Sequence, residues 1–461
     1  MESGVPQTTD PRRQLDNELT LKLSFLGAIK FLEASEYALI QLMVDNEIWI
    51  GPVPENPGGS GDVEWGLLPY WVHHPPAFIL DYIQSHETLN LAWKGLEAIL
   101  PARIDSANYD ALLKRVEQAG LVATDGTIFG TGQYEQIDLR WLFSLVNYLI
   151  VVTSGDVAPF SNKQVAPVPL EGVQGRVKIA LVGDWGTGAF KNGEAVGVMQ
   201  QIMSLKPDYL IHLGDVYYAG TAGDFLPLNE EMNNFLNDWP DTSQLPAGNS
   251  FMLNSNHEMY SGAKGYFDVG LADERFNRQQ GTSYFALQYA GWTILGLDSA
   301  YYSPSALFMA GDLGTNGVQS DWIRGLNLDP DRVIVLTHHN GLSYDGSVEF
   351  TPFWDQINEA LNGDPAAWYW GHVHNGVAYK SPTVTDRKTL ARCVGHGAIP
   401  YGDQFGTAGS GRVDYYAHTP APAPPRVLNG FALLTIDSNG VVTEEFYELG
   451  LTGAKYSNQY G

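Results

Sequence analysis

Residues 177–186 have the sequence VKIALVGDWG, an apolar run that ends at Gly183-Asp184-Trp185-Gly186. A short run of aliphatic and β-branched residues stopped by a glycine predicts a buried β-strand followed by a loop. An aspartate at that point could simply turn the chain, but polar residues follow further apolar runs in the same way. Because open α/β sheets place ligand sites at the carboxyl ends of their strands, these residues are expected to meet at one sheet edge.

The polar residues after the strands form five short sets whose residue types suit metal coordination. Oxygens of Asp, Tyr and Asn combined with neutral His nitrogens suit iron, zinc or manganese, whereas magnesium and calcium sites use oxygen nearly throughout. Two metals about 3.5 to 4 Å apart need one bridging carboxylate, for which Asp215 is the best candidate. After the first set, the others are Gly214-Asp215-Val216-Tyr217-Tyr218, Asn256-His257-Glu258, Thr337-His338-His339-Asn340 and Gly371-His372-Val373-His374.

The pattern of apolar runs predicts an α/β fold and two domains. Residues 1–170 contain several helical patterns and are expected to form a mostly helical N-terminal region of unknown role. Residues 171–461 are expected to form the catalytic domain. The boundary between the two domains falls within a linker at 155–175 that contains several prolines. Helices are expected near 193–205, 318–327 and 353–362, and strands at 177–182, 209–213, 284–289, 292–297, 333–337 and 368–370.

Composition argues against several classes of function. The net charge of −26 over 461 residues disfavours nucleic acid and anionic membranes as partners, because both are bound through clustered Lys and Arg. The single cysteine, Cys393, excludes an intramolecular disulfide and a Cys-based zinc cluster. The sequence shows neither an apolar signal segment at its start nor a membrane-spanning stretch, so a cytoplasmic location is expected.

The five sets resemble those of the calcineurin-like metallophosphoesterase superfamily, over roughly residues 176–400. Most members have Asp-x-His in the first set, whereas Gly186 occupies the third position here. Purple acid phosphatases share that Asp-x-Gly and carry a tyrosine three residues after the bridging aspartate, where this chain has Tyr218. The resemblance therefore implies the purple acid phosphatase branch and a four-layer α/β sandwich, in which two sheets are flanked by helices. Ser255 departs from the glycine usual before the asparagine.

The resemblance also implies a metal content and a reaction. The first site would hold Fe³⁺ and the second Fe²⁺, Zn²⁺ or Mn²⁺. His257 matches the residue that contacts substrate and helps to protonate the leaving group. The implied reaction is in-line attack of a metal-bound hydroxide on a phosphate monoester, without a covalent phosphoenzyme. The implied ligands are Asp184, Asp215, Tyr218 and His374 for the first metal, and Asp215, Asn256, His338 and His372 for the second.

Several alternatives remain open at the level of sequence. Tyr217 competes with Tyr218, and His339 competes with His338 or serves as a substrate contact beside it. His396, in a glycine-rich segment, is either a phosphate contact or an ordinary loop histidine. The rival functions are a phosphodiesterase or nucleotide hydrolase on the same scaffold, and a non-catalytic binding protein whose metals are structural.

Overall fold

The computed structural model describes residues 154–188, 194–222, 231–315, 317–399, 410–419 and 427–461, together with 144, 147–148 and 151–152. The chain divides into two compact units, Met1–Val146 and Asn147–Gly461. The expected helical region therefore lies mostly outside the described residues. The expected linker belongs to the second unit, where part of it forms strand β1 (Val168–Pro169).

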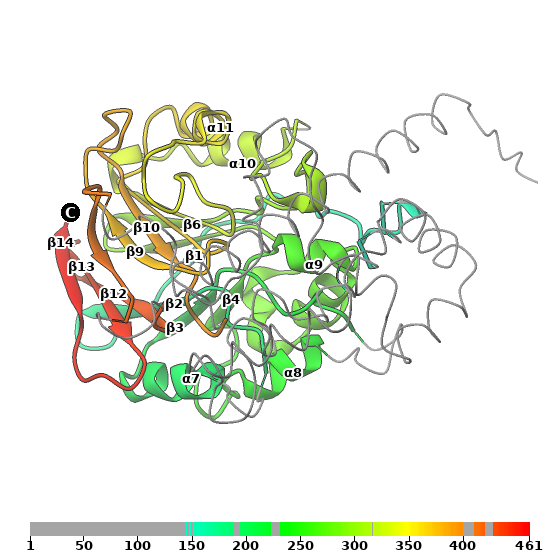
Figure 1. The fold of residues 1–461 in the computed structure, drawn as a ribbon, viewed down its shortest axis with the longest axis horizontal. Helices are drawn as coiled ribbons and strands as arrows, with labels where there is room; N and C mark the ends of the chain where they lie inside the picture. The colour runs from blue at the N-terminus through cyan, green and yellow to red at the C-terminus, as the bar shows by residue number, and fades with distance from the viewer. Residues whose placement is uncertain are drawn as a thin grey trace, which may run out of the picture. The chain divides into compact units, whose positions relative to one another are not determined.

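Fourteen strands in the described residues form two sheets (Figure 1). The eight-stranded sheet has the order β1-β5-β6-β7-β8-β10-β9-β11, and the six-stranded sheet has the order β14-β13-β12-β2-β3-β4. The eight-stranded sheet contains, besides β1, strands β5 (Phe285–Tyr289), β6 (Trp292–Gly296), β7 (Val333–Thr337), β8 (Ala367–Trp370), β9 (Gly376–Tyr379), β10 (Leu390–Val394) and β11 (Val413–Tyr416). The six-stranded sheet contains β2 (Arg176–Val182), β3 (Tyr209–His212), β4 (Ser250–Met252), β12 (Gly430–Asp437), β13 (Val442–Glu448) and β14 (Tyr456–Tyr460).

Helices cover the outer face of each sheet. Helices α7 (Glu194–Ser204) and α8 (Glu231–Asp238) bury residues such as Val198 against Val182 of the six-stranded sheet. Helices α10 (Val318–Leu326) and α11 (Thr351–Leu361) pack in the same way against the eight-stranded sheet. The remaining helices are short: α9 (Asn256–Tyr260), the π-helix η1 (Gly265–Gly270) and the 3₁₀ helices η2 (Glu274–Gln279), η3 (Ala306–Phe308) and η4 (Pro330–Arg332).

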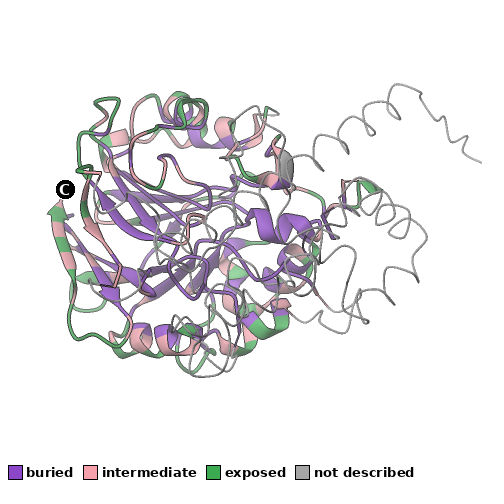
Figure 2. Ribbon diagram, viewed as in Figure 1, coloured by how far each residue is buried: buried purple, intermediate pink, exposed green. Residues whose placement is uncertain are grey.

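The alternation of side chains along the strands explains why two sheets stack. Leu181 and Leu336, from different sheets, belong to one buried cluster, while their neighbours Val182 and Val335 turn outward to the helices. Figure 2 shows the inner strands buried, whereas the edge strand β14 is partly exposed. The order helix, sheet, sheet, helix confirms the four-layer α/β sandwich. Within the described part of the chain, no helix combines the length and apolar character that crossing a bilayer needs.

Candidate metal centre

The predicted ligands follow strands whose carboxyl ends point the same way. Strands β2, β3 and β4 are parallel to one another, and so are β6, β7, β8 and β10 of the other sheet. The loops after these strands therefore meet at one edge of the sandwich, where such folds place their sites. The six-stranded sheet contributes Asp184, Asp215 and Asn256, and the eight-stranded sheet contributes His338, His372 and His374.

Four of these residues have a left-handed backbone, which non-glycine residues adopt rarely. The φ angles are 57° for Asp184, 72° for Asp215, 68° for His372 and 52° for His374. Each costs free energy, on the order of 1 kcal/mol or more, and such conformations persist where surrounding contacts enforce them, often at functional sites. From the sequence, His372 and His374 are expected at the end of a strand. The left-handed backbone instead directs the two side chains to different partners.

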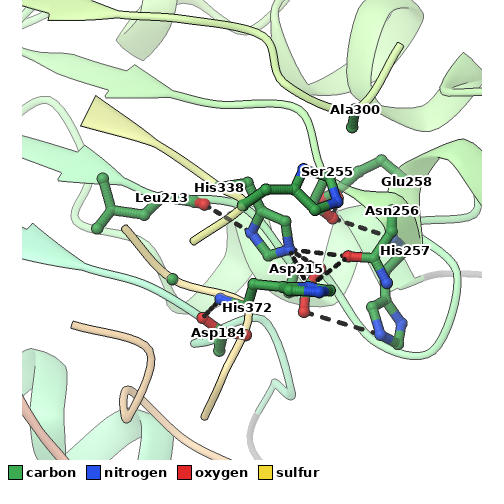
Figure 3. Close-up of polar contacts among 12 residues, drawn as sticks. Asp184, Leu213, Asp215, Ser255, Asn256, His257, Glu258, Ala300, His338 and His372 are labelled. Atoms are coloured by element: carbon green, nitrogen blue, oxygen red, sulfur yellow. Dashed lines mark hydrogen bonds and ion pairs between the residues drawn. The ribbon is translucent and has the colours of Figure 1, made fainter. Parts of the chain in front are cut away.

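One cluster of ligand atoms surrounds Nε2 of His338. Its Nδ1 donates to the Leu213 carbonyl at 2.9 Å, so in the neutral ring Nε2 carries a lone pair. Burial lowers the pKa of His338 to about 4, which keeps the ring neutral. Asn256 Oδ1 lies 2.8 Å and Asp215 Oδ1 3.2 Å from Nε2, with His372 Nδ1 at 3.1 Å. Figure 3 shows these groups converging.

This cluster contains more acceptors than available protons. Asn256 Nδ2 donates to Tyr260 Oη at 2.9 Å, which turns the amide oxygen inward. That oxygen, the Asp215 oxygen and His338 Nε2 have no proton of their own to share, and a proton on His372 Nδ1 reaches the Asn256 oxygen or His338 Nε2 but leaves the buried Asp215 Oδ1 without a hydrogen-bond partner. Three lone pairs that meet in a buried place repel one another unless a cation lies among them. The donor set therefore fits a metal ion, and Asp184, Asp215 and His338 form a candidate metal-binding triad.

A second cluster surrounds the Tyr217 hydroxyl. Tyr217 Oη lies 3.1 Å from Asp184 Oδ1, 3.0 Å from Asp215 Oδ2 and 2.9 Å from His374 Nε2. Burial and the charge of Asp215 raise the pKa of Asp184 to about 8. Burial lowers the pKa of His374, but hydrogen bonds to the two carboxylates outweigh it and raise the value to about 9. A site that attracts protons this strongly also attracts metal cations.

The structure brings the hydroxyl of Tyr217, the neighbour of the predicted Tyr218, into this cluster. The Tyr218 backbone carbonyl accepts a hydrogen bond from His257 Nδ1 at 2.7 Å. Gly186, where most members of the superfamily carry histidine, has no room for a side chain, because a Cβ would lie 2.6 Å from the Cα of Val216. The Tyr217 hydroxyl is therefore a candidate for the ligand atom that position 186 cannot supply.

His257 lies beside both clusters. Its Nε2 is 3.7 Å from Asp215 Oδ2, and burial lowers its pKa. The Ser255 hydroxyl accepts from the His257 amide at 3.0 Å and caps α9, so the unusual serine has a local function. The Glu258 carboxylate accepts from the Val216 amide at 3.0 Å, which ties α9 to the loop after β3. These contacts fix the position of the imidazole.

The two remaining predicted residues, His339 and His396, lie in different surroundings. His339 packs its ring 4.7 Å from that of His372, with Nδ1 2.9 Å from Ser299 Oγ and Nε2 2.7 Å from the Phe308 carbonyl. It supports the ligands from behind and is fully buried. The His396 ring is buried against Phe446, and its described contacts include none of the ligand side chains. Substrate contact by either residue remains a sequence-based prediction.

Sequence reasoning missed Tyr260, whose hydroxyl orients Asn256. The available signal was its spacing, four residues after Asn256, which places both side chains on one face of a helix.

Comparison with known proteins supports the predicted superfamily. Residues 177–376 match the family model described as calcineurin-like phosphoesterase, so the chain contains a metallophosphoesterase domain. Among solved structures, GAP50, described as the anchor in the inner membrane complex of Plasmodium, aligns with a TM-score of 0.45 and 11% identity, over 62% of this chain and 89% of that one. Vps29 from Cryptosporidium parvum aligns with a TM-score of 0.28 and 13% identity, over 62% and 98% of the two chains. The search of curated proteins found no match.

Proposed function

We propose that this metallophosphoesterase domain hydrolyses phosphate monoesters at a centre of two metal ions. The observation that carries the proposal is the position of Asp215, whose Oδ1 lies 3.2 Å from His338 and whose Oδ2 lies 3.0 Å from Tyr217. One buried carboxylate that directs its two oxygens into two ligand sets meets the requirement of a bridged metal pair. When bound, the two cations would activate water and stabilise charge on the phosphoryl group.

The first set of the proposed centre contains Asp184 Oδ1, Asp215 Oδ2, Tyr217 Oη and His374 Nε2. The second contains Asp215 Oδ1, Asn256 Oδ1, His338 Nε2 and His372 Nδ1. Each set mixes anionic or amide oxygens with imidazole nitrogens, which favours iron, zinc or manganese over magnesium or calcium.

His257 is the proposed proton donor. The Tyr218 carbonyl holds its Nδ1, so the opposite nitrogen, Nε2, faces the centre next to Asp215. When the ring is protonated, Nε2–H can donate to the oxygen of a departing alcohol or phenol. A general acid beside the phosphoryl position suits hydrolysis, in which the leaving group must gain a proton.

The purple acid phosphatase branch is supported by Gly186 together with a tyrosine hydroxyl in the cluster, although Tyr217 follows Asp215 by two residues and not by the three that the resemblance implies. The glycine excludes a histidine ligand, and the tyrosine hydroxyl lies among the remaining ligands of the same set. We therefore propose Fe³⁺ in the set that contains Tyr217, since a ferric ion is a hard acid that prefers a phenolate oxygen.

Metal analysis combined with two nitrophenyl esters tests the function. The purified protein is expected to contain about two metal ions per chain and to hydrolyse 4-nitrophenyl phosphate faster than bis(4-nitrophenyl) phosphate. A faster reaction with the diester would identify a phosphodiesterase. A metal-loaded protein that hydrolyses neither ester would refute the proposal.

Visible absorption tests the tyrosine assignment with a matched pair of variants. A ferric phenolate absorbs visible light, so Tyr217→Phe is expected to abolish a purple or pink band, whereas Tyr218→Phe retains it. Loss of the band in Tyr218→Phe alone would instead support the assignment made from the sequence. Iron content measured in parallel separates loss of the ligand bond from loss of the metal.

A further inference from the structure

Helix α8 is joined to the loop after β3 through its first residue, Glu231. The Oε2 atom of Glu231 accepts from the Ala219 amide at 2.8 Å and from the Thr221 amide at 3.0 Å. The amide of the next residue, Met232, donates to the Thr221 carbonyl at 3.0 Å. Three hydrogen bonds thus connect the start of α8 to the part of the loop that follows Tyr217.

Packing reinforces this connection. Met232 of α8 and Val216 of the loop belong to one buried cluster, and neither is exposed. Gly220, between the two amides that Glu231 holds, has no room for a side chain, because a Cβ there would lie 2.8 Å from Cγ of Glu258 on α9. The loop is therefore in close contact with both α8 and α9.

Glu231 and Glu258 hold different parts of this loop. Glu258 accepts at 3.0 Å from the amide directly after Asp215, and the Asp215 carbonyl accepts from the Gly186 amide at 3.2 Å. Both contacts keep the bridging aspartate in place without Glu231. The contacts of Glu231 come after Tyr217, so loss of its carboxylate would release the tyrosine end of the loop and leave Asp215 held.

We propose that Glu231 is a positioning residue that keeps the Tyr217 hydroxyl in the first ligand set. This inference rests on the proposed function, because Tyr217 is a ligand only where the centre holds metal. Glu231 acts through the main chain and touches neither the metal nor the substrate. It makes α8, on the outer face of the six-stranded sheet, part of the support of the centre.

The affinities for two metal ions test this assignment. The full chain is freed of metal and loaded with Fe³⁺ and Zn²⁺, and competition with a chelator measures each affinity. In Glu231→Ala, the affinity for Fe³⁺ is expected to fall about tenfold or more, the usual effect of losing a group that orients a ligand. The affinity for Zn²⁺ in the second set should stay unchanged. Glu231→Gln keeps one oxygen acceptor and should show a smaller loss.

A double-mutant cycle shows whether Glu231 acts through the tyrosine. Because Tyr217→Phe has no hydroxyl left to position, adding Glu231→Ala to it should cause little further loss of Fe³⁺ affinity. Equal losses in the wild-type and Tyr217→Phe backgrounds would overturn the inference, since Glu231 would then support the site independently of Tyr217. If Glu231→Ala does not fold, the same cycle with Glu231→Gln decides the question.

Asp321→Ala is the matched control. Asp321 is also an acidic residue in the first turn of a helix, here α10, and its carboxylate pairs with Arg324 at 2.7 Å. Its removal should leave both metal affinities unchanged. A wild-type protein that binds neither ion would overturn the proposed centre itself. Full Fe³⁺ affinity in Glu231→Ala, beside a wild type that binds both ions, would overturn only the function assigned to Glu231.

Discussion

At the scale of single residues, a hydrogen bond on the far side of two candidate ligands, His338 and Asn256, decides which of their atoms faces the candidate centre. The Leu213 carbonyl holds Nδ1 of His338, and the Tyr260 hydroxyl holds Nδ2 of Asn256. In each case the opposite atom, a nitrogen lone pair or an amide oxygen, is turned inward. Such outer partners fix the orientation of a metal ligand before the metal arrives.

Removing the Tyr260 hydroxyl should weaken metal binding in the second set. Asn256 Nδ2 then keeps only the weak thioether acceptor of Met309, so its amide can rotate more easily and present nitrogen, a poor metal ligand, to the candidate centre. In Tyr260→Phe we expect about a tenfold or larger loss of affinity for the metal proposed to bind at Asn256 and His338. Competition with a chelator measures this affinity without reference to activity.

Tyr266→Phe is the control for this prediction. Tyr266 is also buried, and its hydroxyl donates to the Met252 carbonyl at 2.8 Å, but its described contacts include none of the ligand side chains. Each variant loses a buried hydroxyl with two hydrogen bonds, so the two should lose comparable stability. Equal metal affinity in the two variants would show that Tyr260 does not position Asn256.

Sequence could predict which residue types gather at the centre but not every atom that faces it. Asp184, Asp215 and His338 were predicted from their places after strands and lie together. Tyr217 and Tyr218 are adjacent and have the same side chain, and both lie within one residue of the position expected after Asp215. Which of them faces inward depends on the local backbone path and on Glu258, which holds the Val216 amide from another loop. That contact is not visible in a local pattern.

At the scale of elements, a buried histidine links strand β3 to helix α8. His212 is fully buried, and its ring lies 4.8 Å from Phe235 and 5.8 Å from Trp239. Neither ring nitrogen has a hydrogen-bond partner, so the side chain acts as an apolar group. Burial lowers the pKa of His212 to about 3.

This histidine should make the fold sensitive to acid. The folded pKa lies below the ordinary value of 6.5, so between pH 6.5 and about 3 the unfolded chain binds a proton that the folded chain does not. The free energy of unfolding is therefore unaffected above pH 6.5 and falls as the pH is lowered, by at most about 1.4 kcal/mol per pH unit. Urea unfolding at pH 7 and pH 5 measures the change.

His212→Phe should flatten this pH dependence, since the aromatic surroundings accept phenylalanine and nothing there titrates. The difference in unfolding free energy between pH 7 and pH 5 should be smaller in the variant than in the wild type. The comparison uses the difference in unfolding free energy between the two pH values within each protein. A loss of stability caused by altered packing is the same at both pH values and therefore cancels. An identical difference in both proteins would show that His212 does not carry the effect.

Elements with continuous apolar runs were predictable, and those with buried charges were not. The expected strands at 177–182 and 333–337 match β2 and β7 within a residue. Strand β13 has the sequence VTEEFYE, in which Glu444 is fully buried. A carboxylate inside a strand is tolerated only with a partner, here Arg392, which lies fifty-two positions away in the sequence. The sequence around Glu444 therefore does not predict that partner.

At the scale of the whole described domain, the candidate metal centre depends on how the two sheets are held together. Arg392 on β10 and Glu444 on β13 belong to different sheets and form a buried ion pair, with Nη2 2.6 Å from Oε1. Tyr369 Oη and Asn458 Nδ2 donate to the same carboxylate at 2.6 and 2.9 Å. The pair thus joins the sheet that carries the aspartates to the sheet that carries the histidines.

Breaking this pair should destabilise the domain far more than replacing it. In Arg392→Met the Glu444 carboxylate stays buried without its cation, which typically costs about 3 to 5 kcal/mol in the free energy of unfolding. In the double variant with Glu444→Leu both charges are gone, and most of that loss should be recovered, because apolar residues of similar volume can replace a buried pair at little cost. Urea unfolding of the wild type, the single variant and the double variant measures both steps. A double variant as unstable as the single one would mean that packing around Arg392, rather than an unpaired charge on Glu444, determines how the two sheets are joined.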